Sequence, residues 1–373
     1  MPFFKTASKT VLLGLGLAKL GLAQYSIADD YSDPSTFFSQ FTFFTDSDPT
    51  HGFVTYVDQS TAQSDGLIST TSDTVTMGVD HTNVQTSGRP SVRITSNTVY
   101  NHALVVLDAA HMPGGICGTW PAFWMVGPNW PNDGEIDIVE GVNDQTENDM
   151  TLHTGAGCSI TNDGDFTGSI IFSDCDSSGS SNDGCQIQDS RTSSYGSAFN
   201  SANGGVYAME WTSSDINVWF WTRGSAPSDV SGSSPDPSGW GEPVAQFQGD
   251  CTIDSSFKDL QIVFDTTFCG DWAGNSWTGS CASLADTCTD YVGQNPSAFA
   301  DAYWTINSLK VYTDSSADEN GKVISRVKSG SGNQTVTDAP SLNLPNHGTS
   351  AGGIVGGKKR HLAGQRRRRG AHW

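Results

Sequence analysis

Short runs of alternating apolar and polar residues fill the chain from residue 35 to residue 313, and clusters of Gly, Asn, Asp, Ser and Pro separate them. A period of two is typical of β-strands that bury one face, whereas the longer period of amphipathic helices is nearly absent. Many short strands with frequent turns predict an all-β sandwich or barrel. The clearest expected strands lie at residues 91–94, 104–107, 151–153, 170–172, 261–264 and 303–312.

One β-hairpin is predicted together with its turn. Residues 206–211 and 216–221 are rich in aromatic and β-branched side chains, which suit a pleated, half-buried sheet, and the polar residues 213–215 separate them. We expect the tryptophans of this hairpin to serve packing; they are Trp211, Trp219 and Trp221.

The chain divides into one expected domain and two tails. A β-sandwich commonly uses about 200 to 250 residues or more, so residues 24–313 are assigned to a single domain. Residues 1–23 combine lysines, a short apolar run and small final residues, the layout of a secretory signal peptide. A membrane anchor needs about 20 apolar residues, and Lys19 interrupts this run. We therefore expect a protein secreted to the extracellular space or the cell wall, with no membrane partner.

The C-terminal stretch 314–373 has a different composition. It is rich in Ser, Gly, Asn, Asp and Pro, then becomes basic, and contains the glycosylation sequon at Asn333. Such a sequence cannot bury a core, so it is expected to be a disordered tail. A role for the arginines at 366–369 in binding an acidic wall component is kept as a hypothesis, and an end without function is preferred.

Eight cysteines lie within the expected domain. An even number of cysteines in an exported protein predicts disulfide bonds. No Cys-x-x-Cys spacing and no paired histidines accompany them, so no zinc site is expected. The sequence leaves open which cysteine pairs with which.

The charge distribution limits the class of partner. The formal net charge is −21 at pH 7, and only six of the 19 Lys and Arg residues fall between residues 24 and 313. An acidic domain repels nucleic acid and anionic lipid, and it suits a neutral partner such as a polysaccharide.

Three carboxylates stand within six residues of an apolar stretch, namely Glu135, Asp137 and Glu140. Like charges this close repel each other, and burial in a strand raises the free energy of ionising them. A purely structural strand would avoid this arrangement. Glycoside hydrolysis explains it, because that reaction uses two carboxyl groups, one ionised and one protonated. In a retaining enzyme the ionised group attacks the anomeric carbon and the protonated group donates to the leaving oxygen.

The spacing of these carboxylates requires a local irregularity. Side chains alternate along a strand, so Glu135 and Asp137 share one face whereas Glu140 would point to the other. A β-bulge at residues 138–139 adds one residue and returns Glu140 to the first face. We therefore predict a bulge there, with Asp137 between the two glutamates and placed to hydrogen-bond Glu135.

The segment 135–140 resembles the Glu-x-Asp-x-x-Glu motif of glycoside hydrolase family 16, the laminarinase and lichenase group, in its bulged form. The resemblance covers roughly residues 30–313 and includes segments similar to the secreted fungal branch at 88–94, 111–115, 120–124 and 140–143. It implies a concanavalin A-like β-jelly-roll sandwich of two curved antiparallel sheets, with a substrate cleft on the concave face. It further implies internal hydrolysis of β-1,3- or mixed β-1,3/1,4-glucans, with Glu135 as nucleophile, Asp137 as assisting carboxylate and Glu140 as acid/base.

Sugar rings stack on aromatic side chains, so a glucan cleft is expected to contain tryptophan. The candidates for substrate contact are Trp120, Trp124, Trp130 and Trp272, each of which also suits a core position. His153 lies on the next expected strand, where the fungal branch usually has a histidine near the catalytic face. For His153, substrate contact and a structural role remain equal alternatives.

Other functions are weaker. A transglycosylase would use the same carboxylates, because a sugar hydroxyl can replace water in the second step. A non-catalytic carbohydrate-binding jelly roll has no need of three adjacent carboxylates. A calcium site usually recruits a Gly-turned loop, and the Gly-x-Ser-x-Gly match at 348–352 lacks the flanking strand and helix of a serine hydrolase. We expect a monomeric glycoside hydrolase that needs no metal and no cofactor, binds β-glucan and binds no nucleic acid.

Overall fold

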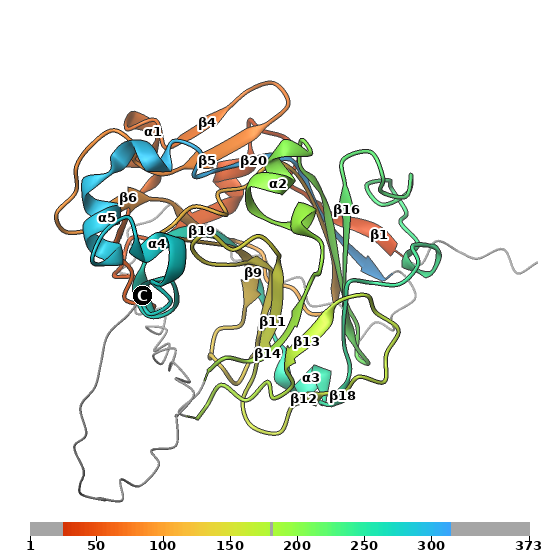
Figure 1. Ribbon diagram of the computed structural model, residues 1–373. Coiled ribbons are helices and arrows are strands. Elements are labelled where there is room, and N and C mark those ends of the chain that lie inside the picture. The colour runs from red at the N-terminus through yellow and green to blue at the C-terminus, as the bar shows by residue number, and fades with distance from the viewer. Residues whose placement is uncertain (1–24, 180–181, 315–373) are drawn as a thin grey trace, which may run out of the picture.

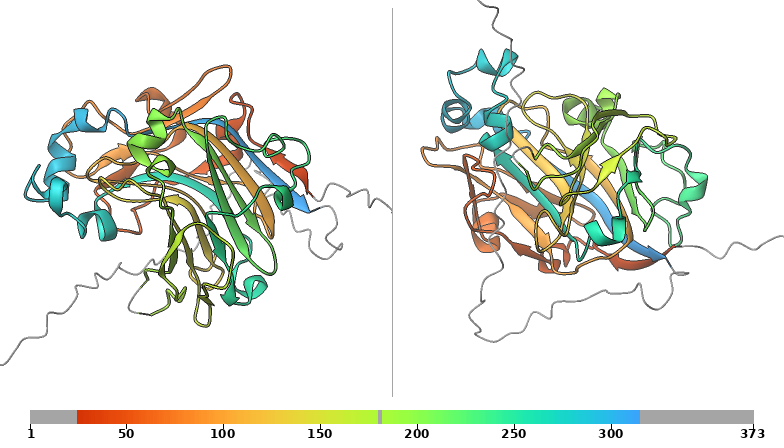
Figure 2. Two further views of the ribbon diagram at one scale, coloured as in Figure 1. Left: turned by 45° about the vertical axis from the view of Figure 1, so that its right-hand side comes forward. Right: turned by 90° about the horizontal axis from the view of Figure 1, so that it is seen from below.

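The computed structural model describes residues 25–179 and 182–314. The expected signal peptide, the sequon and the C-terminal tail fall outside these residues, apart from Asp314. Two eight-stranded antiparallel sheets lie face to face and are strongly curved (Figure 1; Figure 2). The predicted all-β jelly-roll sandwich is therefore confirmed.

The first sheet, here sheet A, is built on the long strand β20. Its order is β17-β16-β15-β8-β20-β5-β4, and β1 also pairs with β20. The bounds are β1 Tyr25–Asp30, β4 Ile68–Thr70, β5 Val75–Gly78, β8 Ala103–His111, β15 Gly205–Trp211, β16 Ile216–Thr222, β17 Ala245–Phe247 and β20 Tyr303–Asp314.

The second sheet, sheet B, carries the three carboxylates on strand β10. Its order is β13-β14-β11-β10-β9-β19-β7-β2. The bounds are β2 Phe41–Phe43, β7 Arg93–Ser96, β9 Thr119–Val126, β10 Glu135–Glu140, β11 Asp149–His153, β13 Ser169–Phe172, β14 Cys185–Gln188 and β19 Gln261–Phe268.

Short strands, helices and turns lie outside the two main sheets. Two further strand pairs are small: β3 Val54–Tyr56 with β6 Arg89–Ser91, and β12 Ser159–Ile160 with β18 Gly249–Asp250. The α-helices are α1 Gln59–Ser64, α2 Gly196–Ser201, α3 Ile253–Ser256, α4 Gly279–Ala282 and α5 Cys288–Gln294. Single 3₁₀ turns occur at Phe37–Gln40, Thr192–Ser194, Pro237–Gly239 and Pro296–Phe299, and a π turn at Gly270–Gly274. No helix in the described ranges is long and apolar enough to cross a membrane.

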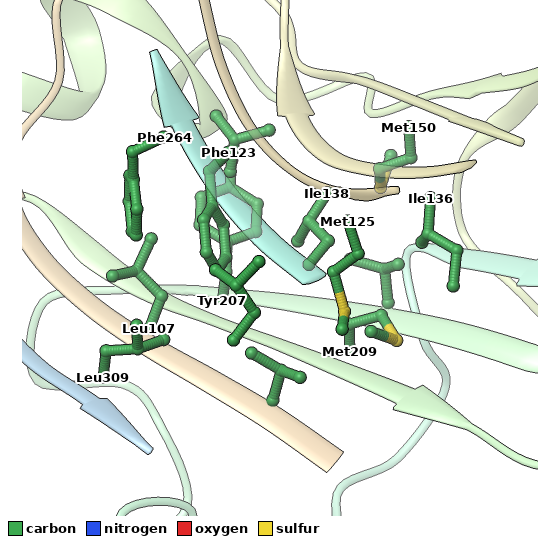
Figure 3. Packing of buried hydrophobic residues seen from close by; sticks show 14 of the residues in the cluster. Leu107, Phe123, Met125, Ile136, Ile138, Met150, Tyr207, Met209, Phe264 and Leu309 are labelled. Atoms are coloured by element: carbon green, nitrogen blue, oxygen red, sulfur yellow. The ribbon is translucent and has the colours of Figure 1, made fainter. Parts of the chain in front are cut away.

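The main core fills the space between the two sheets (Figure 3). Sheet A contributes Leu107, Tyr207, Met209 and Leu309, and sheet B contributes Phe123, Met125, Ile136, Ile138, Met150 and Phe264. Burying one such side chain stabilises the fold by about 1.5–3 kcal/mol. This burial fixes the register of β10, because a shift by one residue would turn its carboxylates into the core.

The predicted hairpin is formed by β15 and β16, with Val206 opposite Trp221 and Trp211 opposite Ile216. Trp211 is buried in the main core. Trp219 and Trp221 lie on the outer face of sheet A, where Trp240 meets both rings edge to face at 5.4 and 5.5 Å. The packing role expected for the hairpin tryptophans is thus observed.

One expected strand is divided in two. Residues 89–91 form β6, which pairs in parallel with β3, whereas residues 93–96 form β7, which pairs with β19 and β2 in sheet B. The division occurs at Val92, a buried residue between the two strands. The alternation in the sequence continues through this point and therefore did not reveal the change of partner.

All eight cysteines form disulfide bonds, as predicted, and the structure supplies the pairing. The pairs are Cys117–Cys281, Cys158–Cys251, Cys175–Cys185 and Cys269–Cys288. Two of them attach the helical segment with α4 and α5 to the end of the sandwich, at the side of sheet B where β9 begins (Figure 1).

Candidate active site

Strand β10 presents two different faces. Ile136 and Ile138 are fully buried in the core between the sheets, and Glu135 and Asp137 point to the opposite, concave face of sheet B. Glu135 is 9% exposed and Asp137 only 2% exposed. The alternation of a regular strand thus places both carboxylates in the same hollow.

The predicted β-bulge is present. Against β11, Asp137 pairs with Thr151 and Glu140 with Asp149, so β10 contains one extra residue between these two pairs. The consecutive residues Ile138 and Val139 both belong to the core. Glu140 therefore returns to the concave face, where it lines one pocket with Glu135 and Asp137.

This pocket contains most of the residues predicted for the site. Its wall includes all three carboxylates together with Trp120, Trp124, Trp130 and His153. Residues that the sequence did not single out complete it: Asp48, Thr50, Arg93, Ala122, Asn182, Asp265 and Thr267. Asp265 and Thr267 alternate with core residues on β19. This alternation could have indicated that they face the pocket, but many strands with one exposed face show the same pattern.

Trp272 does not line this pocket. Its ring meets Trp120 edge to face, with ring centroids 5.6 Å apart, and it packs in a small cluster with Val142 and Ala273. Trp272 thus supports Trp120, which in turn donates a hydrogen bond of 2.8 Å from Nε1 to Oε1 of Glu140. A direct contact of Trp272 with substrate stays a prediction.

His153 lies beside Glu135 and Asp137. Its Nε2 is 3.4 Å from Oδ2 of Asp137 and 3.7 Å from Oε1 of Glu135, and its Nδ1 is 2.9 Å from Oγ of Ser177. Burial lowers the pKa of His153, although Glu135 opposes this effect. The expected hydrogen bond between Asp137 and Glu135 is not found among the described residues, where Oδ2 of Asp137 and Oε2 of Glu135 have no hydrogen-bond partner.

The two glutamates differ in their electrostatic surroundings. Burial raises the pKa of Glu135, as does Asp137, whereas His153 and Arg93 lower it. Burial also raises the pKa of Glu140, Asp137 adds to this, and Asp149 and Asp265 raise it further, opposed by the Trp120 hydrogen bond. Carboxylates thus act on both glutamates, and Glu140 itself raises the pKa of Glu135, but only Glu135 also has the Arg93 guanidinium and the His153 ring to oppose them. This asymmetry favours an ionised Glu135 and a protonated Glu140.

A further buried carboxylate, Asp265, lies in the wall of the pocket. Asp265 accepts hydrogen bonds of 2.9 Å from Nε1 of Trp124 and from the hydroxyl of Tyr56. Burial raises the pKa of Asp265 to about 6, although Arg93 opposes this. The Arg93 guanidinium lies 4.9 Å from the Trp124 ring centroid and 4.7 Å from that of Phe44. These contacts fix the orientation of the Trp124 ring at the wall.

Within residues 25–179 and 182–314, two groups of side chains have the geometry to share a cation. Glu135, Asp137 and His153 bring one ligand atom each within 4.8 Å of one another, and so do Cys117, Asp144 and Cys281. The second group is unsuitable because its cysteines form a disulfide. In the first group, both carboxylates also face the pocket with Glu140, an arrangement that acid/base chemistry explains without a metal.

Comparison with known proteins identifies the family. A family model described as an XgeA-like, catalytic GH16 domain matches residues 41–312. The chain belongs to glycoside hydrolase family 16. It is 51% identical over 317 residues to an endo-1,3(4)-beta-glucanase of Arthroderma benhamiae, covering 83% of this chain and 69% of that protein. Several similar family members are longer: the chain spans 46% of a probable endo-1,3(4)-beta-glucanase of Aspergillus clavatus.

Two solved structures of family 16 members are similar along nearly their whole length. GH16 laminarinase 16A of Phanerochaete chrysosporium, with beta-glucans in donor and acceptor sites, is 45% identical with a TM-score of 0.75, and the match covers 78% of this chain and 99% of that one. An elongating family 16 beta-1,3-glucosyltransferase is 47% identical with a TM-score of 0.73, covering 78% and 100%. This family 16 chain therefore has relatives of both hydrolysing and transferring type.

Proposed function

We propose that this family 16 glycoside hydrolase cuts β-1,3- or mixed β-1,3/1,4-glucans internally, with retention of configuration. The observation that carries the proposal is the bulge in β10, which brings Glu135 and Glu140 to one pocket with different charged neighbours. Relatives named endo-1,3(4)-beta-glucanase support the choice of substrate class.

In this mechanism Glu135 is the nucleophile. Its carboxylate attacks the anomeric carbon while the carboxylic acid of Glu140 protonates the glycosidic oxygen, so that the bond to the leaving sugar breaks and a covalent glycosyl-enzyme forms. The ionised Glu140 then removes a proton from water, whose oxygen attacks the anomeric carbon and releases Glu135. Two inversions at this carbon give net retention.

The neighbouring residues support these two steps. Asp137, between the glutamates, raises the pKa of both by its charge and disfavours a state in which all three carboxyl groups are ionised. Arg93 and His153 favour the ionised form of Glu135. Trp120, Trp124 and Trp130 supply aromatic surface in the same pocket, which suits stacking against glucose rings.

Transfer to a second sugar is the alternative outcome of the same intermediate. The similarity to an elongating beta-1,3-glucosyltransferase favours keeping it as a second candidate. A sugar hydroxyl would then take the place of water, and Glu140 would remove its proton. The four disulfides also support secretion into an oxidising extracellular space or cell wall. The monomeric state stays a prediction.

The test is incubation of the purified protein with laminarin, barley β-glucan and xyloglucan. Proton NMR of the first products should show the β-anomer, and the viscosity of the glucan should fall before many reducing ends appear. Products longer than the starting oligosaccharide, detected by mass, would indicate transfer. An α-anomeric first product would rule out the retaining mechanism.

Matched variants assign the roles. Glu135→Gln and Glu140→Gln should each lower glucan hydrolysis at least about a thousandfold, because each removes a group required in both steps. Glu242→Gln, an exposed glutamate in the loop before β17, should keep wild-type activity. Near wild-type turnover by either pocket variant would refute the assignment.

A further inference from the structure

The bulge leaves two backbone groups of β10 in need of partners. Where one strand contains an extra residue, the ladder to the neighbouring strand is interrupted and its peptide groups lose their regular partners. A buried peptide group without a hydrogen bond destabilises the fold, so the bulge requires a substitute partner. On the side of β11, the side chain of Asn148 provides it.

The Asn148 amide joins both sides of the bulge. Its Oδ1 accepts a hydrogen bond of 3.0 Å from the backbone N–H of Glu140, and its Nδ2 donates one of 2.9 Å to the carbonyl of Ile138. A side-chain amide carries a donor and an acceptor in one plane, as a peptide group does. Asn148 therefore takes the place of the missing strand residue.

Asn148 is itself held firmly. Its side chain is completely buried. Its backbone N–H donates a hydrogen bond of 3.1 Å to Oγ of Ser194, and its carbonyl accepts one of 2.9 Å from the N–H of Asp189. Asn148 is thus held in place and can in turn hold the backbone of Glu140 in one position.

We propose that Asn148 is a positioning residue that sets the conformation of the bulge and so aims the carboxyl of Glu140 at the glycosidic oxygen. This inference rests on the proposed function, in which Glu140 is the acid/base. Asn148 lines no part of the pocket and acts through the backbone groups of Ile138 and Glu140. Its loss should impair proton donation more than substrate binding.

A comparison of leaving groups tests this role. Breaking a glucan linkage requires protonation of the leaving oxygen, whereas a dinitrophenyl β-laminaribioside releases a stable phenolate without an acid. For Asn148→Ala we expect kcat/KM to fall at least about thirtyfold with laminarin and less than about threefold with the dinitrophenyl substrate. Asn217→Ala, which removes a buried amide on β16 that contacts Glu210, should change both values equally. Equal losses with both substrates for Asn148→Ala would overturn the proposal.

The isosteric variant Asn148→Asp keeps the shape of the side chain and adds a pH readout. When the introduced carboxyl is protonated, it can still donate to the Ile138 carbonyl and accept from the Glu140 N–H, but its ionised form places two acceptors face to face. Glucan hydrolysis by this variant should therefore approach the wild-type rate at acidic pH and decline at a lower pH than in the wild type. A profile that keeps the wild-type alkaline limb would contradict the inference.

The outcomes also separate this inference from the function on which it rests. If Glu140→Gln hydrolyses laminarin as the wild type does, the proposed function fails. If Glu140→Gln is inactive but both Asn148 variants behave like the wild type, only the positioning role fails. Circular dichroism of each variant checks that the sandwich is folded.

Discussion

The indole Nε1 of Trp120 donates a 2.8 Å hydrogen bond to Oε1 of Glu140, so an aromatic residue of the pocket also controls the proposed acid/base. This bond favours the ionised form and lowers the pKa of Glu140, against the effects of burial and of Asp137. Hydrogen bonds to charged groups are worth about 1.5–3 kcal/mol, which is large enough to affect a titration. Strands β9 and β10, adjacent in sheet B, create this contact.

Trp120→Phe should shift the pH profile to the alkaline side. The variant keeps an aromatic ring but loses the donor, so the pKa of Glu140 rises and its acid form persists to higher pH. We expect the alkaline limb of kcat/KM for laminarin to move upward, with about tenfold lower activity at the optimum from the altered carboxyl position. An unchanged limb, measured from pH 4 to 9, would show that the bond does not influence the acid.

Asp265→Asn should shift the same limb in the opposite direction. Asp265, whose pKa is raised by burial to about 6, raises the pKa of both Asp137 and Glu140 when it is ionised. Asparagine removes this charge and can still accept from Nε1 of Trp124. The alkaline limb of kcat/KM should therefore move to lower pH, and the fluorescence of the folded state should stay close to that of the wild type. A shift to higher pH would contradict the assigned direction.

The buried carboxyl of Glu135 should make the free energy of unfolding fall as the pH rises. Burial raises the pKa of Glu135, so the unfolded chain releases this proton at a lower pH than the folded protein does. The folded state then binds more protons, and the free energy of unfolding falls as the pH increases above the ordinary carboxyl range near about 4. Glu135→Gln removes this loss. Its Tm should exceed that of the wild type at pH 7 by at least about 2 °C, since about 1 kcal/mol corresponds to about 2–4 °C in a domain of this size.

Calorimetry between pH 4 and pH 7 checks this expectation. The difference in Tm between Glu135→Gln and the wild type should shrink toward pH 4, where both folded and unfolded wild-type carboxyls are protonated to a larger extent. The exposed Glu242→Gln serves as the control and should follow the wild type throughout. A wild-type advantage at pH 7 would mean that ionised Glu135 stabilises the fold.

The disulfide Cys117–Cys281 should affect both stability and substrate binding. It joins residues 164 positions apart and fastens α4 near the segment that carries Trp272, whose ring supports Trp120. Replacing both cysteines with serine should lower the free energy of unfolding by about 2–5 kcal/mol. We also expect the KM for laminarin to rise several-fold, because the support of Trp120 is loosened.

The pair Cys158–Cys251 is a matched control. It lies beside β12 and β18, and none of its atoms belongs to the wall of the pocket. Serine at both positions should lower stability by a similar amount and leave KM unchanged. Thermal unfolding and laminarin kinetics should be measured on both double variants. They show whether a rise in KM comes from the loosened support of Trp120 or from a general loss of stability.

Much of the site could be predicted from local sequence. The alternation of Glu135 and Asp137 with Ile136 and Ile138 fixes which side chains are buried, because successive residues of a strand point to opposite faces. The odd spacing to Glu140 was enough to predict the bulge, since only an extra residue brings it to the same face. The tryptophans before β10 were found by their chemistry, and three of them line the pocket.

Tertiary structure decided the contacts that join distant segments. The sequence contained no signal for the pairing of the cysteines, for the position of Asp265 opposite Arg93 across β19 and β7, or for the packing of Trp272 on Trp120. Local patterning determines which face of a strand is buried, since that depends only on the alternation of residues. Which strands become neighbours depends on the free energy of the whole assembled core, and so the surroundings that distinguish Glu135 from Glu140 appear only in the folded protein.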